Sequence, residues 1–169
     1  MRGKRRKERM ILKNATLHIG NGEVFQGDMR IADGKIVEVG KNINGDESRS
    51  LNGKHVFPGF IDSGNFLGAQ DMAFFAKDYN ENSNPVTPYL DIWHSIDPDE
   101  LSLQELYKAG ITSMLVTPGN EGILGGTCTV VKTKGKNINK ITVKRDAAMK
   151  ASMTSEVIRV FSGKGSPQT

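Results

Sequence analysis

The chain has 169 residues, of which 37% are hydrophobic, with 23 basic and 19 acidic side chains and one cysteine. This length fits one domain, or one domain with a small second lobe. No stretch approaches the roughly 18 consecutive apolar residues of a membrane-spanning helix, and the N-terminus lacks the apolar core of a secretory signal. A single cysteine excludes an internal disulfide and a thiolate metal cluster. We therefore expect a cytoplasmic protein that does not bind membranes.

Charge is distributed unevenly along the chain. Residues 1–9 carry a net charge of +5, residues 10–131 carry −8 and residues 132–169 carry +7. A basic N-terminal arm over residues 1–9 can bind phosphates, but such arms are more often solvated extensions. No aromatic residue is interleaved with the basic runs, and no zinc-finger or helix-turn-helix pattern is present. Nucleic acid is therefore not an expected partner.

Residues 10–57 are predicted to form a β-meander. Alternating apolar side chains over 35–39, preceded by residues 29–32 and an Asp-Gly turn, predict the strongest hairpin of the sequence. A sheet of this size needs another layer to pack on. Four dipeptides suit tight hairpin turns in this stretch: Asn21-Gly22, Asp33-Gly34, Asn44-Gly45 and Asn52-Gly53.

The second part of the sequence predicts a βαβ unit. The apolar run at residues 55–62 indicates a buried parallel strand whose carboxyl end, Asp62, meets a site. A long polar loop over 68–96 is typical of a functional loop or lid. Capping at Asp97 and a stop at Gly110 predict a helix. Three further elements are expected beside it: strands at 111–116 and 127–133, and a mixed helical stretch from residue 146.

None of the three histidines has the i, i+2 or i, i+4 partner that is typical of a metal site. His18 and His55 are predicted to be half-buried structural residues. His94 lies in the polar loop near Asp91 and Asp97, which makes it a candidate for a weak acid–base role. No nucleophile–histidine pair can be argued, and the Gly-rich segment lacks the ending of a phosphate-binding loop. The sequence therefore assigns no catalytic residue.

Residues 11–68 resemble the N-terminal region of the metal-dependent amidohydrolase superfamily. The resemblance lies in the segments ILKNATLHIGNGEVFQGDMRIADGKIVEVG and LNGKHVFPGFIDSGNFLG. Three later segments are similar to the imidazolonepropionase-like branch of that superfamily: DYNENSNPVTPYL, AGITSMLVTPGNEGILGGTCTVVKTKG and AAMKASMTSEVIRVFSGKGSPQT. The resemblance therefore extends over most of the chain.

The resemblance implies a β meander, forming half of a small β-sandwich, followed by an incomplete α/β barrel portion of the TIM type. The expected domains are the basic arm at 1–9, the β-sandwich part at 10–54 and the partial (β/α) barrel part at 55–169. Members of the superfamily hydrolyse carbon–nitrogen bonds other than peptide bonds. They use Zn or another divalent metal, held by histidines and carboxylates at the carboxyl rim of the barrel, to activate water.

The chain departs from the family pattern in two ways. Family members carry His-x-His after Pro-Gly-Phe-Ile-Asp, whereas Gly64 and Phe66 occupy those two positions here and offer no ligand atom. A complete barrel takes about 250 residues, so the strands that bring the family's other ligands are expected to be missing. We therefore expect a truncated gene, a split gene or a fragment, with no metal site and no cofactor of its own.

The leading hypothesis is a truncated or degenerate amidohydrolase-like protein without catalytic activity alone. One alternative is a subunit that supplies part of a hydrolase site, with Asp62, Asn65 and His94 binding substrate in a cavity that another chain completes. A second alternative is a non-catalytic interaction module, so whether the chain is an enzyme stays open. The unpaired edge strands of a partial barrel predict a homo-oligomer or a companion chain that supplies the rest of the barrel.

Overall fold

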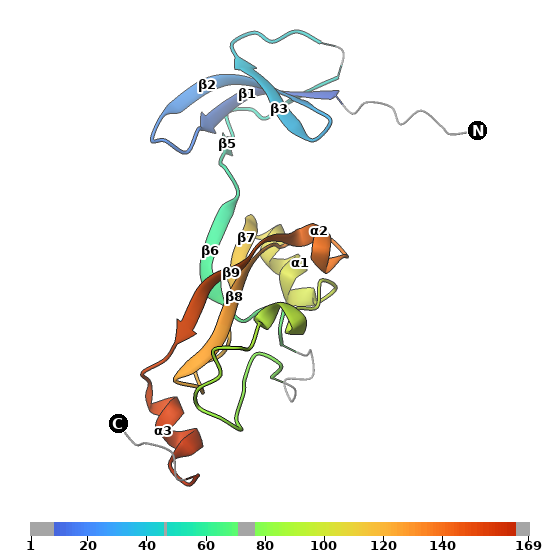
Figure 1. The fold of residues 1–169 in the computed structure, drawn as a ribbon. Helices are drawn as coiled ribbons and strands as arrows, with labels where there is room; N and C mark the ends of the chain where they lie inside the picture. Colours follow the sequence, from blue (N-terminus) through green and yellow to red (C-terminus); the bar gives the residue numbers. More distant parts are fainter. Residues whose placement is uncertain (1–8, 46, 71–76, 165–169) are drawn as a thin grey trace, which may run out of the picture. The chain divides into compact units, whose positions relative to one another are not determined.

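The structure, a computed structural model, describes residues 9–45, 47–70 and 77–164. The chain divides into two compact units, Met1–Pro58 and Gly59–Thr169. Both are built around a β-sheet, and the described helices are few and short (Figure 1). Residues 1–8 of the predicted basic arm lie outside the described residues, and Arg9 is already the first residue of a strand.

The first unit is a five-stranded sheet in the order β3-β2-β1-β4, with β5 also paired to β1. The antiparallel pairing of β1 with β2 and of β2 with β3 confirms the predicted meander up to residue 40. The last two strands differ from it, because β4 and β5 run parallel to β1. After β3 the chain crosses to the edge of β1 that β2 does not occupy. There β4 and β5 run in the same direction as β1. The strands are β1 (Arg9–His18), β2 (Val24–Ala32), β3 (Lys35–Gly40), β4 (Ser48–Ser50) and β5 (His55–Val56).

The predicted hairpin turn at Asp33-Gly34 is confirmed. Both residues have positive φ, 52° and 74°, and Ala32 pairs directly with Lys35. This backbone is the one that a two-residue turn of right-handed strands requires. The prediction at Asn44-Gly45 is wrong, because neither residue there has a positive φ. A Cβ at Gly45 would lie 2.6 Å from Ile11 Cδ1, the far end of a side chain that can shift.

The core of the first unit is small. Ala15, Leu17 and Met29 are buried on β1 and β2, and five apolar side chains pack around them. β3 lies at the sheet edge, and its residues Lys35 to Val39 are all exposed, with Ile36 at 63% and Val37 at 57%. Both faces of β3 are therefore uncovered by the described residues.

The second unit is a four-stranded sheet in the order β6-β7-β8-β9. β6 and β7 are parallel, and α1 connects them, which confirms the predicted βαβ unit. From β7 onward the sheet is antiparallel, so the regular β/α alternation of a barrel does not continue through the described residues. The elements are β6 (Phe60–Asn65), η1 (Ile92–Ser95), α1 (Leu101–Lys108), β7 (Ile111–Val116), β8 (Leu124–Lys132), α2 (Ile138–Ile141), β9 (Thr142–Ala151) and α3 (Ser155–Phe161).

The strand predicted at residues 55–62 is divided between the two sheets. His55 and Val56 pair with β1, whereas β6 begins at Phe60 and continues to Asn65. Pro58 lies between them and has no N–H to donate to a ladder, which ends the first pairing. The predicted division between residues 54 and 55 accordingly falls before β5, whereas the change of unit falls after Pro58.

The helix after the polar loop begins later than predicted. Oδ1 of Asp97 accepts the N–H of Asp99 at 2.9 Å, which makes a turn before the helix rather than a cap on it. The N-cap position of α1 is Glu100, whose side chain makes no capping hydrogen bond. The predicted stop is confirmed, because Gly110 follows the helix with φ of 92°.

Residues 142–151 form strand β9 rather than the predicted helical stretch. β9 pairs with β8 from Val131↔Thr142 to Leu124↔Ala151. Ladder hydrogen bonds to a distant segment therefore override the local helix preference of Ala147, Ala148 and Met149. Among the described residues of the predicted helical tail, which end at 164, residues 155–161 are helical, as α3.

The core of the second unit lies between the sheet and the segments that cover it. α1 lies beside β7 (Figure 1), and Leu103 of α1 is 1% exposed. No helix within the described residues is long and apolar enough to cross a membrane. The buried core residues are Ala69, Ile92, Ile96, Leu103, Met114, Val116, Val131 and Ile141.

Candidate functional site

The carboxyl end of β6 carries a β-bulge that presents two polar side chains. Asp62 pairs with Met114 and Asn65 pairs with Val116, so β6 uses one residue more than β7 between these points. Bulges of this kind leave a backbone group unpaired and redirect side chains, and they are frequent beside active sites. Since β6 and β7 are parallel, their carboxyl ends form one edge of the sheet, where ligands bind in open α/β sheets.

The Asp62 carboxylate holds this bulge together. Oδ1 of Asp62 accepts the backbone N–H of Gly64 at 2.9 Å, and Oδ2 accepts the side-chain amide of Asn65 at 2.6 Å. Oδ1 of Asn65 in turn accepts the N–H of Leu67 at 2.8 Å. Asp62 and Asn65, predicted with His94 to line one cavity, are thus a hydrogen-bonded pair.

Gly64 and Phe66 bring no metal ligand to this edge. A Cβ at Gly64 would lie 3.4 Å from Thr117 Cγ2, an ordinary contact, so the position has room for a side chain that this sequence lacks. The Phe66 ring stacks on Tyr79 with ring centres 4.2 Å apart. No group of three or more His, Cys, Asp or Glu side chains that could hold a metal ion occurs in the described residues.

The polar loop crosses the carboxyl end of β7. The N–H of Gly119, which follows β7, donates to the carbonyl oxygen of Tyr79 at 2.8 Å. The next residue, Asn80, packs against Gly119 so closely that no Cβ fits there. Oδ1 of Asn80 is buried and has no hydrogen-bond partner among the described residues, which leaves an acceptor without compensation.

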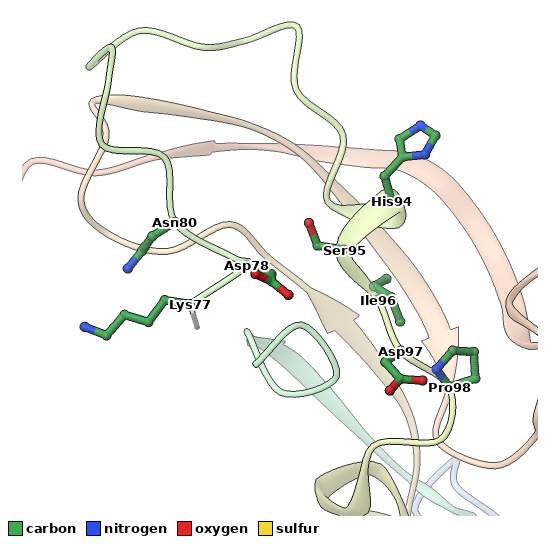
Figure 2. A pocket seen from close by; sticks show the side chains of 8 residues that line it. All are labelled: Lys77, Asp78, Asn80, His94, Ser95, Ile96, Asp97 and Pro98. Atoms are coloured by element: carbon green, nitrogen blue, oxygen red, sulfur yellow. The ribbon is translucent and has the colours of Figure 1, made fainter. Parts of the chain in front are cut away.

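A polar pocket of about 610 Å³ lies between this loop and η1. Figure 2 shows the Asp78 carboxylate facing the Ser95–Pro98 segment, while the ammonium of Lys77 points away from that segment. Lys77 pairs with Glu121 over 3.8 Å. The lining residues are Lys77, Asp78, Asn80, His94, Ser95, Ile96, Asp97 and Pro98.

His94 lies at the rim of this pocket, and Figure 2 shows its imidazole pointing outward. Its ring meets the edge of Trp93 with ring centres 5.0 Å apart. Trp93 is fixed in turn, because its indole N–H donates to Thr142 at 2.9 Å and the Arg145 guanidinium lies 4.3 Å from its ring centre. The exposed imidazole of His94 therefore packs on a tryptophan that is itself held in place.

Asp91 anchors the start of η1. Its Oδ1 accepts the N–H of Trp93 at 2.9 Å, and its Oδ2 accepts a hydrogen bond from Arg145. Burial opposes the ionisation of this carboxyl. The hydrogen bonds from Arg145 and Trp93, together with the positive charge of Arg145, outweigh burial and lower the pKa of Asp91. The residue is thus a structural anion, and its oxygens are already engaged.

The structure brings Asp62 and Asn65 together, but it does not bring His94 to them. His94 lines the pocket, whereas neither Asp62 nor Asn65 does. Sequence reasoning missed Lys77, Asp78 and Asn80 as lining residues, although the length of the polar loop from 68 to 96 marked the right region. It also missed that His18 and His55 meet, because no local spacing links two residues on different strands.

Among the comparisons with known proteins, the comparison with solved structures finds similarity. No protein-family model and no curated protein matches this sequence. Among solved structures, the chain is similar to an amidohydrolase from Thermotoga maritima MSB8, with a TM-score of 0.83 and 29% identity. The match covers 92% of this chain and 42% of that protein, so this chain spans less than half of its length. The chain therefore has an amidohydrolase-like, hydrolase-related fold.

Proposed function

We propose that this chain is a degenerate or partial amidohydrolase-like protein of the imidazolonepropionase-like branch, without hydrolytic activity of its own. Its relatives would act on carbon–nitrogen bonds other than peptide bonds. The observation that carries the proposal is the carboxyl end of β6, where a fixed Asp62–Asn65 pair stands beside Gly64 and Phe66. In this reading β6 and β7 correspond to the first two strands of a barrel.

The residues at this edge do not fit the divalent metal that the fold family implies. Glycine has no ligand atom, and the Phe66 ring is apolar and packed on Tyr79. One oxygen of Asp62 accepts the Gly64 N–H and the other accepts the side-chain amide of Asn65, so both oxygens already have a partner other than a metal ion. We therefore propose no hydrolytic step by these residues alone.

The polar groups of this unit are suited to binding rather than to chemistry. Asp62 and Asn65 offer fixed acceptors and donors, and His94 offers an exposed imidazole at the pocket rim. We propose that the three residues contact substrate only in a site completed by polypeptide outside the described residues. A second copy of this chain or a companion chain would supply it.

The exposure of β6 supports association. β6 is an edge strand, and its residues Phe60 and Ile61 are 60% and 74% exposed. Covering apolar area of this kind stabilises a complex by about 25 cal/mol per Å². As a second candidate function, the same surface favours a non-catalytic interaction module.

Metal analysis and a hydrolysis assay on the untagged chain test the first proposal. We expect no Zn, Fe or Mn in stoichiometric amount after dialysis against EDTA, and no hydrolysis of a panel of cyclic amides and imides with or without added Zn²⁺. About one metal ion retained per chain, or metal-dependent turnover by the isolated chain, would show that the site is self-sufficient.

A graft provides the matched control. The double variant Gly64→His with Phe66→His restores the family's ligand pair, and a Cβ at position 64 would make only an ordinary contact with Thr117. We expect this variant to remain inactive, because the described residues hold no group of three or more side chains that could bind a metal ion. Robust hydrolysis of a cyclic amide by the double variant would contradict the proposal.

The assembly proposal has its own test. Light scattering coupled to gel filtration should give a mass of at least twice the 18.5 kDa of the chain, and Ile61→Lys should shift the wild-type assembly toward monomer. Ile36→Lys, on the exposed edge of the other sheet, is the control for added charge. A clean monomer that binds no hydrophobic dye would contradict association through β6.

A further inference from the structure

Two histidines distant in sequence meet on the surface of the first unit. Nε2 of His18, at the end of β1, lies 2.8 Å from Nδ1 of His55, at the start of β5. The parallel register places Thr16 beside His55 and Leu17 beside Val56. His18 is therefore diagonal to His55 on the same face of the sheet, which is why the rings reach each other.

The pair is held by the strands and by an aromatic ring. The Phe57 ring stacks on His18 with ring centres 4.0 Å apart and planes 16° from parallel. Phe57 follows β5, and its ring centre lies 6.1 Å from that of His55 with the two planes 16° from parallel. Side chains on paired strands keep their spacing better than side chains on loops, which is what a binding site requires. The pair is also exposed, so an ion from solvent can reach it.

We propose that His18 and His55 form a surface site for a divalent transition cation of the Cu²⁺ or Ni²⁺ type. Two imidazole nitrogens at about 2.0–2.1 Å from one metal lie about 2.9 Å apart when the angle at the metal is 90°. A tetrahedral angle would instead separate them by about 3.3 Å. The observed 2.8 Å is close to the first of these values. The ring centres lie 5.1 Å apart, so the two rings face each other nitrogen to nitrogen, and they must tilt for both lone pairs to point at one ion.

The protons balance without any further reactant. Each neutral imidazole carries one N–H and one lone pair. In the metal-bound form His18 binds through Nε2 with its proton on Nδ1, and His55 binds through Nδ1 with its proton on Nε2. The metal thus replaces the hydrogen bond between the two rings, and water fills the other positions.

Calorimetry of the untagged, EDTA-treated chain with Cu²⁺ and Ni²⁺ tests the site. The variants are His18→Ala, His55→Ala and, as matched control, His94→Ala, which removes the third histidine from the second unit. We expect one ion per chain, a fall in affinity of at least about tenfold in each of the first two variants, and no change in the third. Electron paramagnetic resonance of the Cu²⁺ form should show two nitrogen ligands in the wild type and fewer in either variant.

A second substitution covers the case in which an alanine disturbs the sheet. His55→Gln keeps a polar side chain at the start of β5, and circular dichroism checks that the sheet is intact. A folded His55→Gln that also loses binding supports the site. Binding that is unchanged in His18→Ala and His55→Ala, or equal loss in all three alanine variants, would overturn it. No binding by the wild-type chain would overturn it as well.

Discussion

The side-chain amide of Asn65 donates a hydrogen bond of 2.6 Å to Asp62, across the bulge that ends β6. The same carboxylate accepts the N–H of Gly64, a group that the bulge leaves without a ladder partner. Asp62 therefore supplies the hydrogen-bond acceptor that a neighbouring strand would otherwise supply to this backbone N–H. This explains why an acidic side chain is compatible with the end of an apolar strand.

A double-mutant cycle on this pair should reveal coupling. We expect Asp62→Ala to lower the free energy of unfolding by about 1–2 kcal/mol, because it leaves two donors unpaired in a partly exposed position. Asn65→Ala should cost less, and the two changes together should cost less than their sum by about 0.5–1 kcal/mol. Urea unfolding followed by fluorescence of Trp93, the single tryptophan, measures the second unit. Strict additivity would show that the contact contributes nothing.

Local signals predicted the elements that depend on neighbouring residues. The positive φ at Asp33-Gly34 closes a hairpin between adjacent segments, and Gly110 ends a helix within its own last turn. The apolar run at 111–116 is β7 as predicted, because a strand buried in a sheet needs little besides its own side chains. In each case the information lies within a few residues.

Pairings between distant segments could not be predicted in the same way. The stretch from Asp146 contains good helix formers, yet its residues up to Ala151 pair with β8 as part of strand β9. β4 and β5 return to β1 in parallel, and this return is what brings His55 to His18. Which strand lies next to which is decided by the whole sheet, so neither the histidine pair nor the pocket residues could be read from spacing.

A buried carboxylate supports the bulge in β1. Asp28 is 7% exposed and accepts the N–H of Asn14 at 2.9 Å and the N–H of Ile43 at 3.0 Å. Asn14 has φ of 52°, so its amide is turned out of the regular ladder with β2. Asp28 thereby connects the bulge of β1 to the segment that follows β3.

Removing that carboxylate should destabilise the first unit. We expect Asp28→Ala to lower the free energy of unfolding by about 2–4 kcal/mol, because one buried and one part-buried backbone donor lose their acceptor. Asp28→Asn should cost about half as much, since its carbonyl oxygen can still accept one of them. Far-UV circular dichroism is the appropriate signal, because the tryptophan lies in the other unit. A change within 0.5 kcal/mol for Asp28→Ala, about that of an ordinary surface substitution, would mean that solvent replaces the carboxylate.

The ion pair between Asp91 and Arg145 should make stability depend on pH. The folded state lowers the pKa of Asp91, so the carboxylate stabilises the fold above the pKa of the unfolded chain, which is about 3.9. This contribution is lost as the pH falls through the lower, folded value. Asp91→Asn keeps an acceptor for the Trp93 N–H but removes the charge, so it should flatten the loss of stability below about pH 4.

Urea midpoints measured by tryptophan fluorescence from about pH 7 to about pH 3 check this expectation. The difference between wild type and Asp91→Asn should be largest near neutral pH and should shrink as the medium becomes acidic. Asp99→Asn, at an exposed position, is the control. Parallel pH profiles for the wild type and Asp91→Asn would show that the ion pair adds nothing beyond its hydrogen bonds.

Gly126 should be the least replaceable residue of the Gly-rich segment. It has φ of 105°, and a Cβ there would run into the backbone carbonyl oxygen of Leu90. That same oxygen accepts the N–H of Thr127 at 2.8 Å, so the chain before η1 is fastened to β8 at this point. The backbone of Leu90 cannot withdraw without breaking this bond. The glycine is thus required by close packing, and no phosphate needs to be invoked for it.

Two effects destabilise an alanine at position 126: the positive φ and the overlap of its Cβ with Leu90. Comparison with Gly110→Ala separates them. Gly110 has φ of 92°, but a Cβ there would lie 3.6 Å from the Phe60 ring, an ordinary contact. Its alanine variant should therefore lose only the backbone term, about 1 kcal/mol. Gly126→Ala carries the same term and adds the overlap with Leu90, so we expect it to lose at least about 2 kcal/mol more. Tryptophan fluorescence reports both variants, because both positions lie in the second unit. Equal losses would mean that the Leu90 segment moves aside freely, and η1 would then be loosely attached to β8.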